Sequence, residues 1–453
     1  MPFETAHQAE NFIFSSYMRV QDHLSGPDAL TRTPALTRRL LDNLGQPDHG
    51  FASILVTGSK GKGSISALTA RLLQALGHKV GLVTSPHILD FRERIRINGR
   101  AISEAELVEY VNRLEQPASE IMAELTGERY LSPTGLILAV SSLYFADNEV
   151  EFAVIEAGRG GRFDDCVVLD NPVALFGPMM LEHTVQLGPT LADIASQKVA
   201  LLKRGGVGVS VPQEPEVQLI MQTYAAQNWS GLLFVGRDLQ VVAPRIEEAY
   251  LHLGVQLRAN EFEDLALPIP ALYEAENLAV ALGAVEIVAD EQVLRTVRKE
   301  ELRAALLDFS WPGRMQILAE NPFTLLDCAV TGQSARAVLE SLGTRLQKPV
   351  YAVVGVPEDR DWRGVLDEIA PYCDLLVLSK AANQRLRFPA EAAAYARAHF
   401  SPACPVEESA SFSEAQSILA RYNQPATLLF LGTQSFAADV LKSYGCNTEQ
   451  LWA

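Results

Sequence analysis

Apolar residues in the first half of the chain fall into two patterns that alternate. Short continuous runs predict buried strands, and apolar positions three or four residues apart predict helices. The predicted strands cover residues 54–56, 79–84, 152–156, 173–176, 207–211 and 232–235. The predicted helices cover residues 9–20, 35–44, 65–77 and 136–145, with another beginning near Ser103, where Glu106 completes a capping box. This alternation predicts an α/β fold with a mostly parallel sheet.

A second series of alternating elements follows the sequence WPGR at residues 311–314. It comprises predicted strands at 324–327, 350–354, 375–379 and 426–432, helices at 334–342 and 362–370, and a last helix after the final strand. A complete set of α/β units is enough for a separate domain. We therefore expect two domains, one over residues 1–312 and a smaller, Rossmann-like α/β domain over residues 313–453.

The first predicted strand runs directly into a phosphate-binding pattern, ILVTGSKGKGS. Gly58, Gly61 and Gly63 permit a tight turn whose backbone N–H groups can converge on an anion. Lys62 supplies a positive charge, and Ser64 stands where the hydroxyl of a P-loop reaches a phosphate-bound Mg²⁺. The alternative is an ordinary glycine turn between strand and helix. Because strand, glycines, lysine, serine and helix occur together, we favour a nucleotide site.

Composition narrows the set of partners. The chain has 453 residues, of which 48% are hydrophobic, and a net charge of −17. Nucleic-acid polymers need a broad basic surface, so this charge argues against them, whereas a small anion in one basic pocket is compatible with it. The five cysteines lie far apart without metal-ligand spacing, which favours reduced thiols. The apolar stretch 136–145 is too short to cross a bilayer. We expect a cytoplasmic monomer without membrane contact.

Other charged residues allow two interpretations each. Glu156 ends a predicted buried strand, and ligands of open α/β sheets bind at such ends, but a solvent-facing carboxylate is the alternative. His183 taken alone is more simply a surface histidine. Arg92, Arg94 and Arg96 form either a solvated charged face or a site for an anionic substrate.

Seven short motifs occur in order along the chain: VTGSKGKGS at 56–64, TSPH at 84–87, FRERIRING at 91–99, EAGRGGRFD at 156–164, EHT at 182–184, QK at 197–198 and WPGR at 311–314. Together they resemble the folylpolyglutamate synthase and dihydrofolate synthase family of the Mur ligase superfamily. The resemblance implies a P-loop Mur-ligase-like domain followed by a smaller α/β domain. It also implies an ATP- and Mg²⁺-dependent ligase that forms an acyl phosphate on a folate-like carboxylate and then an amide with glutamate.

The resemblance also implies roles for individual residues. The ATP contacts would be Gly58, Ser59, Gly61, Lys62, Gly63, Ser64, Asn277, Arg314 and Asp327. The Mg²⁺ ligands would be Ser64, Ser85, Glu156 and His183, and the residues acting in catalysis would be Lys62, His183, Lys198 and Arg314. Histidine is an unusual ligand for so hard a cation, so His183 rests on the family match. Lys198 matches a lysine that is carbamylated in the family, and a helix-surface lysine is the alternative.

Several positions depart from the family pattern, most of them in the C-terminal half. The family's Asp-x-Ala-His-Asn-Pro reads Asp327-Cys328-Ala329-Val330-Thr331-Gly332 here, and its His-Gln pair before Asn277 reads Tyr273-Glu274. Lys60, Arg159, Glu182 and the stretch Ser132-Pro133-Thr134-Gly135 also differ. Three hypotheses stay open. The chain is a folate enzyme with divergent motifs, a paralogous ligase acting on a non-folate carboxylate, or a non-catalytic nucleotide-binding relative.

Overall fold

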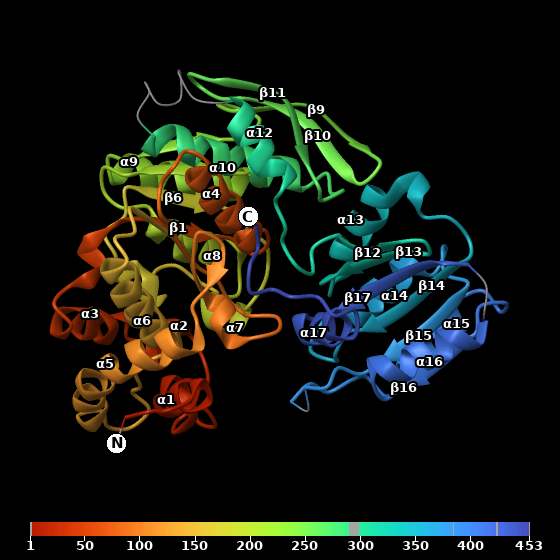
Figure 1. The fold of residues 1–453 in the computed structure, drawn as a ribbon, viewed down its shortest axis with the longest axis horizontal. Helices are drawn as coiled ribbons and strands as arrows, with labels where there is room; N and C mark the ends of the chain where they lie inside the picture. The colour runs from red at the N-terminus through yellow and green to blue at the C-terminus, as the bar shows by residue number, and fades with distance from the viewer. Residues whose placement is uncertain (1, 290–298, 384, 423–424, 453) are drawn as a thin grey trace.

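The computed structural model describes residues 2–289, 299–383, 385–422 and 425–452. Three sheets organise these residues. Figure 1 shows an eight-stranded sheet with its helices in the first part of the chain, a small three-stranded sheet above it, and a six-stranded sheet in teal to blue beside them. The predicted α/β fold class is confirmed, and the boundary at residue 312 stays a prediction.

The eight-stranded sheet is parallel except at one edge. Its order is β4 (Arg100–Ala101), β3 (Ile95–Ile97), β2 (Val80–Val83), β5 (Phe152–Glu156), β1 (Ala52–Thr57), β6 (Val173–Phe176), β7 (Val207–Ser210) and β8 (Gly231–Phe234). Only β3 and β4 run antiparallel to their neighbours. The central strands are buried on both faces, which explains why they read as continuous apolar runs.

Helices cover both faces of this sheet. They are α1 (Ala6–Met18), α2 (Asp28–Thr31), α3 (Pro34–Asn43), α4 (Lys62–Ala75), α5 (Glu104–Ala123), α6 (Pro133–Asp147), α7 (Thr184–Leu187), α8 (Leu191–Lys198) and α9 (Pro215–Gln227). Ile54 and Val56 join the core cluster formed with α4, whereas Leu55 between them joins the cluster formed with α1, α3, α5 and α6. This alternation follows from the two-residue repeat of a strand. The capping box of Ser103 and Glu106 is confirmed at the start of α5.

The antiparallel three-stranded sheet is an element that the apolar pattern did not lead us to predict. It consists of β9 (Gln240–Glu247), β10 (Tyr250–Gln256) and β11 (Glu261–Leu267). Buried and half-buried residues alternate along β10, so the strand has one face on the core and one toward solvent. Helices α10 (Glu274–Val288) and α12 (Lys299–Leu307) follow. Helix α10 packs on α4, and α12 packs on α4 and β11.

The six-stranded sheet follows residue 315. Its order is β12 (Gln316–Glu320), β13 (Phe323–Asp327), β17 (Thr427–Gly432), β14 (Val350–Gly355), β15 (Leu375–Ser379) and β16 (Val406–Ser409). Only β12 is antiparallel. The helices are α13 (Gly332–Leu342), α14 (Trp362–Ile369), α15 (Ala392–His399), α16 (Phe412–Tyr422) and α17 (Gln434–Ser443). The edge strands β12 and β16 were not predicted.

After α17 the chain returns to the edge of the first sheet (Figure 1). The guanidinium of Arg96 donates hydrogen bonds to the carbonyls of Thr448, at 2.7 Å, and Glu449, at 3.0 Å. The Thr448 hydroxyl donates to Glu93 at 2.6 Å, and the Trp452 ring stacks on Phe309 with centroids 5.9 Å apart. We call residues 447–452 the return segment. It joins the end of the second α/β part to β3 and β4.

None of the described helices has the length and apolar character needed to cross a membrane.

Candidate active site

The loop between β1 and α4 lies against residues 177–180. Gly58 has a φ of 146°, and a Cβ built on it would lie 2.9 Å from the Cα of Gly177. The backbone N–H of Ser59 donates to the carbonyl of Pro178 at 2.7 Å. Gly61 has a φ of 74° and begins α4. Glycine is needed at position 58 because another backbone lies so close, and at position 61 because the backbone is left-handed there. The turn places the N-terminus of α4, with its positive dipole end, at the predicted phosphate position.

Two lysines converge on one carbonyl of this loop. The ammonium of Lys62 donates to the carbonyl oxygen of Gly58 at 3.1 Å, and that of Lys198 donates to the same oxygen at 2.9 Å. Lys198 also donates to the carbonyl of Arg159 at 2.9 Å and to the carboxylate of Glu182 at 3.1 Å. Its side chain is fully buried, so the alternative of a helix-surface lysine is wrong.

Burial lowers the pKa of Lys198 to about 8. The positive charge of Lys62 lowers it further, and the negative charge of Glu182 opposes both effects. A substantial fraction of this amine is therefore neutral near pH 8. Neutral amines are nucleophiles, so the site suits a covalent modification at Lys198.

The hydroxyl of Ser64 is held by a buried carboxylate. Ser64 Oγ donates to Glu274 Oε1 at 2.7 Å, and Asn277 Nδ2 donates to Glu274 Oε2 at 3.0 Å. Burial raises the pKa of Glu274, while these two hydrogen bonds oppose the rise. Asn277 Oδ1 is also 2.8 Å from where a Cβ of Gly61 would lie. The start of α10 thus contacts the phosphate loop directly.

Ser85 and Glu156 meet at the carboxyl ends of β2 and β5. The backbone N–H of Ser85 donates to Glu156 Oε2 at 2.9 Å. Desolvation raises the pKa of Glu156, and the charge of Lys62 opposes that rise, followed by those of Arg314 and Arg94. The carboxylate therefore lies among cationic side chains from three parts of the chain. The position is the strand-end site expected for a ligand.

His183 follows Glu182, the carboxylate that Lys198 contacts. It begins the short helix α7 with a φ of 48°, and its side chain is exposed. Partial desolvation lowers its pKa, while the charge of Glu182 raises it. Over the described residues, no cluster of three or more His, Cys, Asp or Glu side chains forms a metal site. Of the four predicted Mg²⁺ ligands, Ser85 and Glu156 are joined by a direct hydrogen bond.

Arg314 and Asp327 form the part of the site that comes from the second sheet. Asp327 Oδ2 accepts a hydrogen bond from the backbone N–H of Met315 at 2.9 Å. This contact fixes the turn that presents Arg314, whose charge acts on Asp327, Tyr273 and Glu274. Burial raises the pKa of Asp327 to about 6, and Arg314 opposes the rise. Asp327 thus positions the arginine.

Two further residues, for which the sequence predicted no role, also approach the loop. A Cβ on Gly63 would lie 2.9 Å from the ring of Trp311, which closes the space above α4. Desolvation lowers the pKa of Lys60, Glu182 opposes the change, and the charges of Lys62, Arg314 and Arg360 add to it. Arg360 comes from the loop after β14 and is distant in sequence, so only the folded chain reveals its proximity.

A small cavity adjoins Glu156 and Ser85. Its volume is about 30 Å³, and Arg94 and Thr134 also line it. The neighbouring Asp165 accepts hydrogen bonds from the hydroxyls of Thr134, at 2.5 Å, Thr37, at 2.6 Å, and Ser132. The polar side chains on this wall of the cavity are thus already hydrogen-bonded to one another.

The three arginines of FRERIRING contact different parts of the structure. Arg92 pairs with Asp90 at 3.0 Å, and Arg96 binds the return segment. Only Arg94 lines the cavity, where it donates to His87 Nδ1 at 3.0 Å. A single arginine is therefore placed to meet an anionic substrate.

The family model for the Mur ligase, glutamate ligase domain matches residues 313–433. Two solved structures share the whole fold. A folylpolyglutamate synthase of Mycobacterium tuberculosis complexed with ADP and AMPPCP superposes with a TM-score of 0.82 at 24% identity, over 96% of this chain and 99% of that chain. The apo form of the L. casei enzyme gives a TM-score of 0.83 at 22% identity, over 97% and 99%. The chain thus shares the fold of these structures, and its residues 313–433 match the glutamate ligase domain of the Mur ligases.

Proteins of similar sequence indicate which ligases this chain resembles. The dihydrofolate synthase/folylpolyglutamate synthase of Mycobacterium tuberculosis is 28% identical over 78% of this chain and 75% of its own length. The folylpolyglutamate synthase of Lacticaseibacillus casei is 28% identical over 73% and 77%. Over most of its length, the chain is therefore similar to the folylpolyglutamate synthase and dihydrofolate synthase family.

Proposed function

We propose that this protein is an ATP- and Mg²⁺-dependent ligase that joins the amine of glutamate to a carboxylate of a folate-type acceptor. The relatives named above carry that activity in their names. The single observation that supports it most is the arrangement around Gly58, where Lys62 and Lys198 meet on one carbonyl. Lys62 also acts electrostatically on the strand-end carboxylate of Glu156.

The proposed reaction has two steps. An oxygen of the acceptor carboxylate attacks the γ-phosphorus of ATP, the bond to the bridging oxygen breaks, and ADP leaves. The amine nitrogen of glutamate then attacks the acyl carbon, loses a proton and expels inorganic phosphate. The first step brings anions together, so the protein's main contribution is cationic stabilisation and alignment.

The residues divide this work between the two sheets. Backbone N–H groups at Gly61 to Gly63 and the ammonium of Lys62 hold the phosphates. Arg314 approaches from the second sheet, where its planar guanidinium can make two parallel contacts to phosphate oxygens. Asp327 holds the turn that carries this arginine. Asn277 borders the loop and contacts the nucleotide beyond the phosphates.

Mg²⁺ would neutralise phosphate charge during the transfer. Oxygen donors of Ser64, Ser85 and Glu156 suit this hard cation. The Ser64 hydroxyl donates a hydrogen bond to Glu274, so the lone pairs of Oγ remain available to a cation. His183 is exposed and makes a poorer ligand for Mg²⁺, so its role is the least supported of the four.

A second candidate is a ligase for a smaller, non-folate carboxylate. The observation that favours it is the small size of the cavity beside Glu156, which is about 30 Å³. The neighbouring Asp165 already accepts hydrogen bonds from Thr37 and Thr134. Pockets for ligands of folate size measure about 300 Å³ or more. A folate acceptor therefore requires this wall to open, whereas a small carboxylate needs less rearrangement.

The test is ADP release by purified protein with ATP, Mg²⁺, glutamate and either tetrahydrofolate or dihydropteroate. We expect release that depends on the acceptor and on glutamate, with an amide product detected by mass spectrometry. Lys62→Ala should abolish turnover because the phosphates lose a charge-assisted contact. Release with small carboxylates but not with folates would select the second candidate. ATP binding without release on any acceptor and amine would support the non-catalytic hypothesis.

A further inference from the structure

Two cysteines lie side by side at the edge of the second sheet, away from the candidate active site. Cys373 precedes β15 and Cys404 precedes β16, and these strands pair in parallel with Leu376 opposite Val406. The backbone N–H of Leu376 donates to the carbonyl of Pro405 at 3.0 Å. The two cysteines therefore occupy the amino ends of neighbouring strands. Asp327 and the residues facing the phosphate loop occupy the carboxyl ends of the same sheet.

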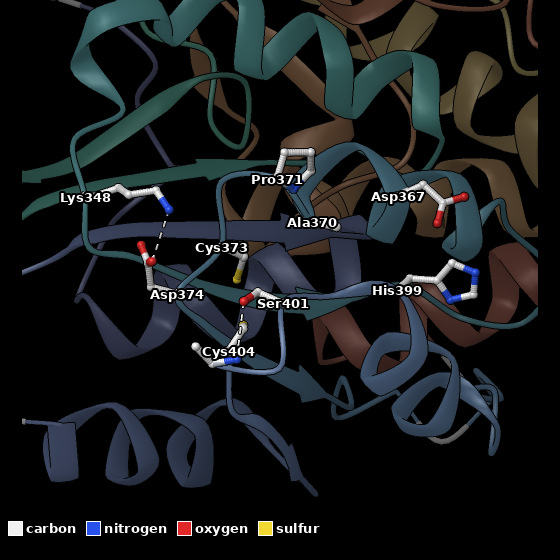
Figure 2. A pocket seen from close by; sticks show the side chains of 10 residues that line it. Lys348, Asp367, Ala370, Pro371, Cys373, Asp374, His399, Ser401 and Cys404 are labelled. Carbon is white, nitrogen blue, oxygen red and sulfur yellow. Dashed lines mark hydrogen bonds and ion pairs between the residues drawn. The ribbon is translucent and has the colours of Figure 1, made fainter.

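The two thiols face each other. Both residues are buried, and each thiol shifts the pKa of the other. Cys373 Sγ donates to the carbonyl of Leu375 at 2.9 Å, and Cys404 Sγ donates to the carbonyl of Pro405 at 3.7 Å. Figure 2 shows the sulfur of Cys373 directed toward the sulfur of Cys404. Each backbone is anchored, Cys373 N–H to the carbonyl of Ile369 at 3.1 Å and Cys404 N–H to that of Ser401 at 2.8 Å. The pair is therefore held in place before any reaction.

A cavity of about 490 Å³ opens beside the pair. Lys348, Asp374, His399 and Ser401 line it together with both cysteines (Figure 2). Such a space admits a small polar oxidant to Cys404. The other three cysteines lie elsewhere in the described structure. Cys166 is deep in the first core, Cys328 lies against Arg314, and Cys446 is half-buried after α17.

We propose that Cys373 and Cys404 form an oxidation-sensitive dithiol, which a peroxide entering from this cavity converts into an intramolecular disulfide. The Cys404 thiolate attacks one oxygen of hydrogen peroxide, the O–O bond breaks, and a sulfenic acid and one water form after proton uptake. The sulfur of Cys373 then attacks the Cys404 sulfur, the S–O bond breaks, and a second water leaves with the Cys373 proton. Two thiols and one peroxide thus give one disulfide and two waters.

The local chemistry sets the order of these steps. Interaction with the Cys373 thiol lowers the pKa of the Cys404 thiol, and desolvation opposes that change. Interaction with the Cys404 thiol and burial raise the pKa of Cys373. Cys404 therefore carries more thiolate and reacts first, and Cys373 resolves the intermediate. The bridge would close a loop through β15 and α15, which restricts the unfolded chain and stabilises the second sheet.

The test uses the folded, full-length protein. After hydrogen peroxide treatment, unfolding and alkylation, we expect a peptide linked through Cys373 and Cys404, with an intact mass lower by two hydrogens. Dithiothreitol should reverse the change. The oxidised protein should melt several degrees higher than the reduced protein, while ADP release stays the same because the pair lies at the opposite sheet edge from the phosphate loop.

Variants separate this bridge from other oxidation. Cys404→Ser should remove both the linked peptide and the rise in melting temperature, whereas the matched control Cys446→Ser should retain both. The wild-type peptide map needs no variant to fold. Recovery of both cysteines fully alkylated after peroxide, a bridge between other cysteines, or sulfinic acid at Cys404 without a bridge would each overturn the proposal.

Discussion

Lys198 shows how burial changes the chemistry of one side chain. Its ammonium makes three hydrogen bonds in a fully buried position, and its pKa falls to about 8. Close to that pH, the neutral form can add to CO₂ and give a carbamate. The product is anionic, so it would relieve the repulsion between Lys198 and Lys62 while adding a negative charge near the phosphate loop.

We predict that Lys198 is carbamylated when bicarbonate is present. In buffer with ¹³C-bicarbonate near pH 8, the protein should show a carbamate carbon resonance that Lys198→Ala lacks. Lys203→Ala is the matched control, because desolvation also lowers the pKa of Lys203 but its ammonium contacts the carbonyl of Val167 instead. An unchanged resonance in Lys198→Ala would assign the carbamate to another amine.

Asp327 should make the stability of the protein depend on pH. Its pKa is about 6 in the folded state because of burial, against about 4 for an unfolded aspartate. The folded state therefore binds the proton more tightly. This stabilising contribution is fully present below about pH 4 and is lost as pH rises through 6, amounting to ~3 kcal/mol.

Urea unfolding between pH 4.5 and 7.5 measures this effect. The free energy of unfolding of Asp327→Asn, which cannot take up the proton, should fall less over this interval than that of the wild type. Glu320→Gln is a suitable control because Glu320 ends β12 on the exposed surface. Parallel curves for the wild type and Asp327→Asn would place the titration elsewhere.

At the scale of elements, the β1 to α4 loop depends on contact between two backbones. An alanine at Gly58 would bring its Cβ to 2.9 Å from the Cα of Gly177, at a φ of 146°. Neither backbone can move without disturbing β1 or β6. Gly77 also has a positive φ, of 95°, but no atom lies within 4 Å of its Cβ position.

We therefore predict that Gly58→Ala lowers the free energy of unfolding by ~3 kcal/mol or more and abolishes ATP binding. Gly77→Ala should cost about 1 kcal/mol and leave ATP binding unchanged. Urea unfolding and calorimetric titration with ATP measure the two quantities. Equal costs at the two positions would mean that backbone conformation, and not the contact with Gly177, governs the loop.

The apolar pattern predicted the elements that are buried on both faces. β1, β5, β6 and β14 read as unbroken apolar runs because their sheets have helices on each side. β9 was missed because it is an edge strand with mostly exposed side chains and a proline at position 244. β16 was missed because it is short and half exposed.

The same limit applies to the site. The glycines and Lys62 were visible because they are adjacent in sequence. The hydrogen bond between Ser64 and Glu274 joins residues 210 positions apart, and Arg360 comes from a different sheet. Such contacts arise from how the sheets pack, which local patterns do not encode.

At the scale of the whole molecule, the return segment stabilises the junction of the two α/β parts. The Arg96 guanidinium is buried, and burial lowers its pKa to about 10. Carbonyls of Thr448 and Glu449 supply two of its hydrogen bonds. Removing these acceptors leaves a buried cation short of partners, which is costly.

Deleting residues 447–453 should therefore lower the free energy of unfolding by ~2–4 kcal/mol. It should also lower turnover more than it lowers the affinity for ATP. Differential scanning calorimetry and steady-state kinetics measure these effects. Gln450→Ala within the segment is a milder control, because its exposed side chain donates hydrogen bonds to the carbonyls of Asn98 and Trp452 and not to a charged group among the described residues. A deletion with wild-type stability would show that Arg96 finds other acceptors.

The second sheet is connected to the first at two places. One is the chain itself at residues 309–315, and the other is the return segment at residues 447–452. A body held by one linker samples a large volume around its attachment point, and a second tether removes most of that volume. The effective concentration of Arg314 at the phosphate loop is correspondingly higher. Under the proposed function, less orientational entropy would be lost when both sheets contact ATP, which would leave more of the binding energy for the reaction itself.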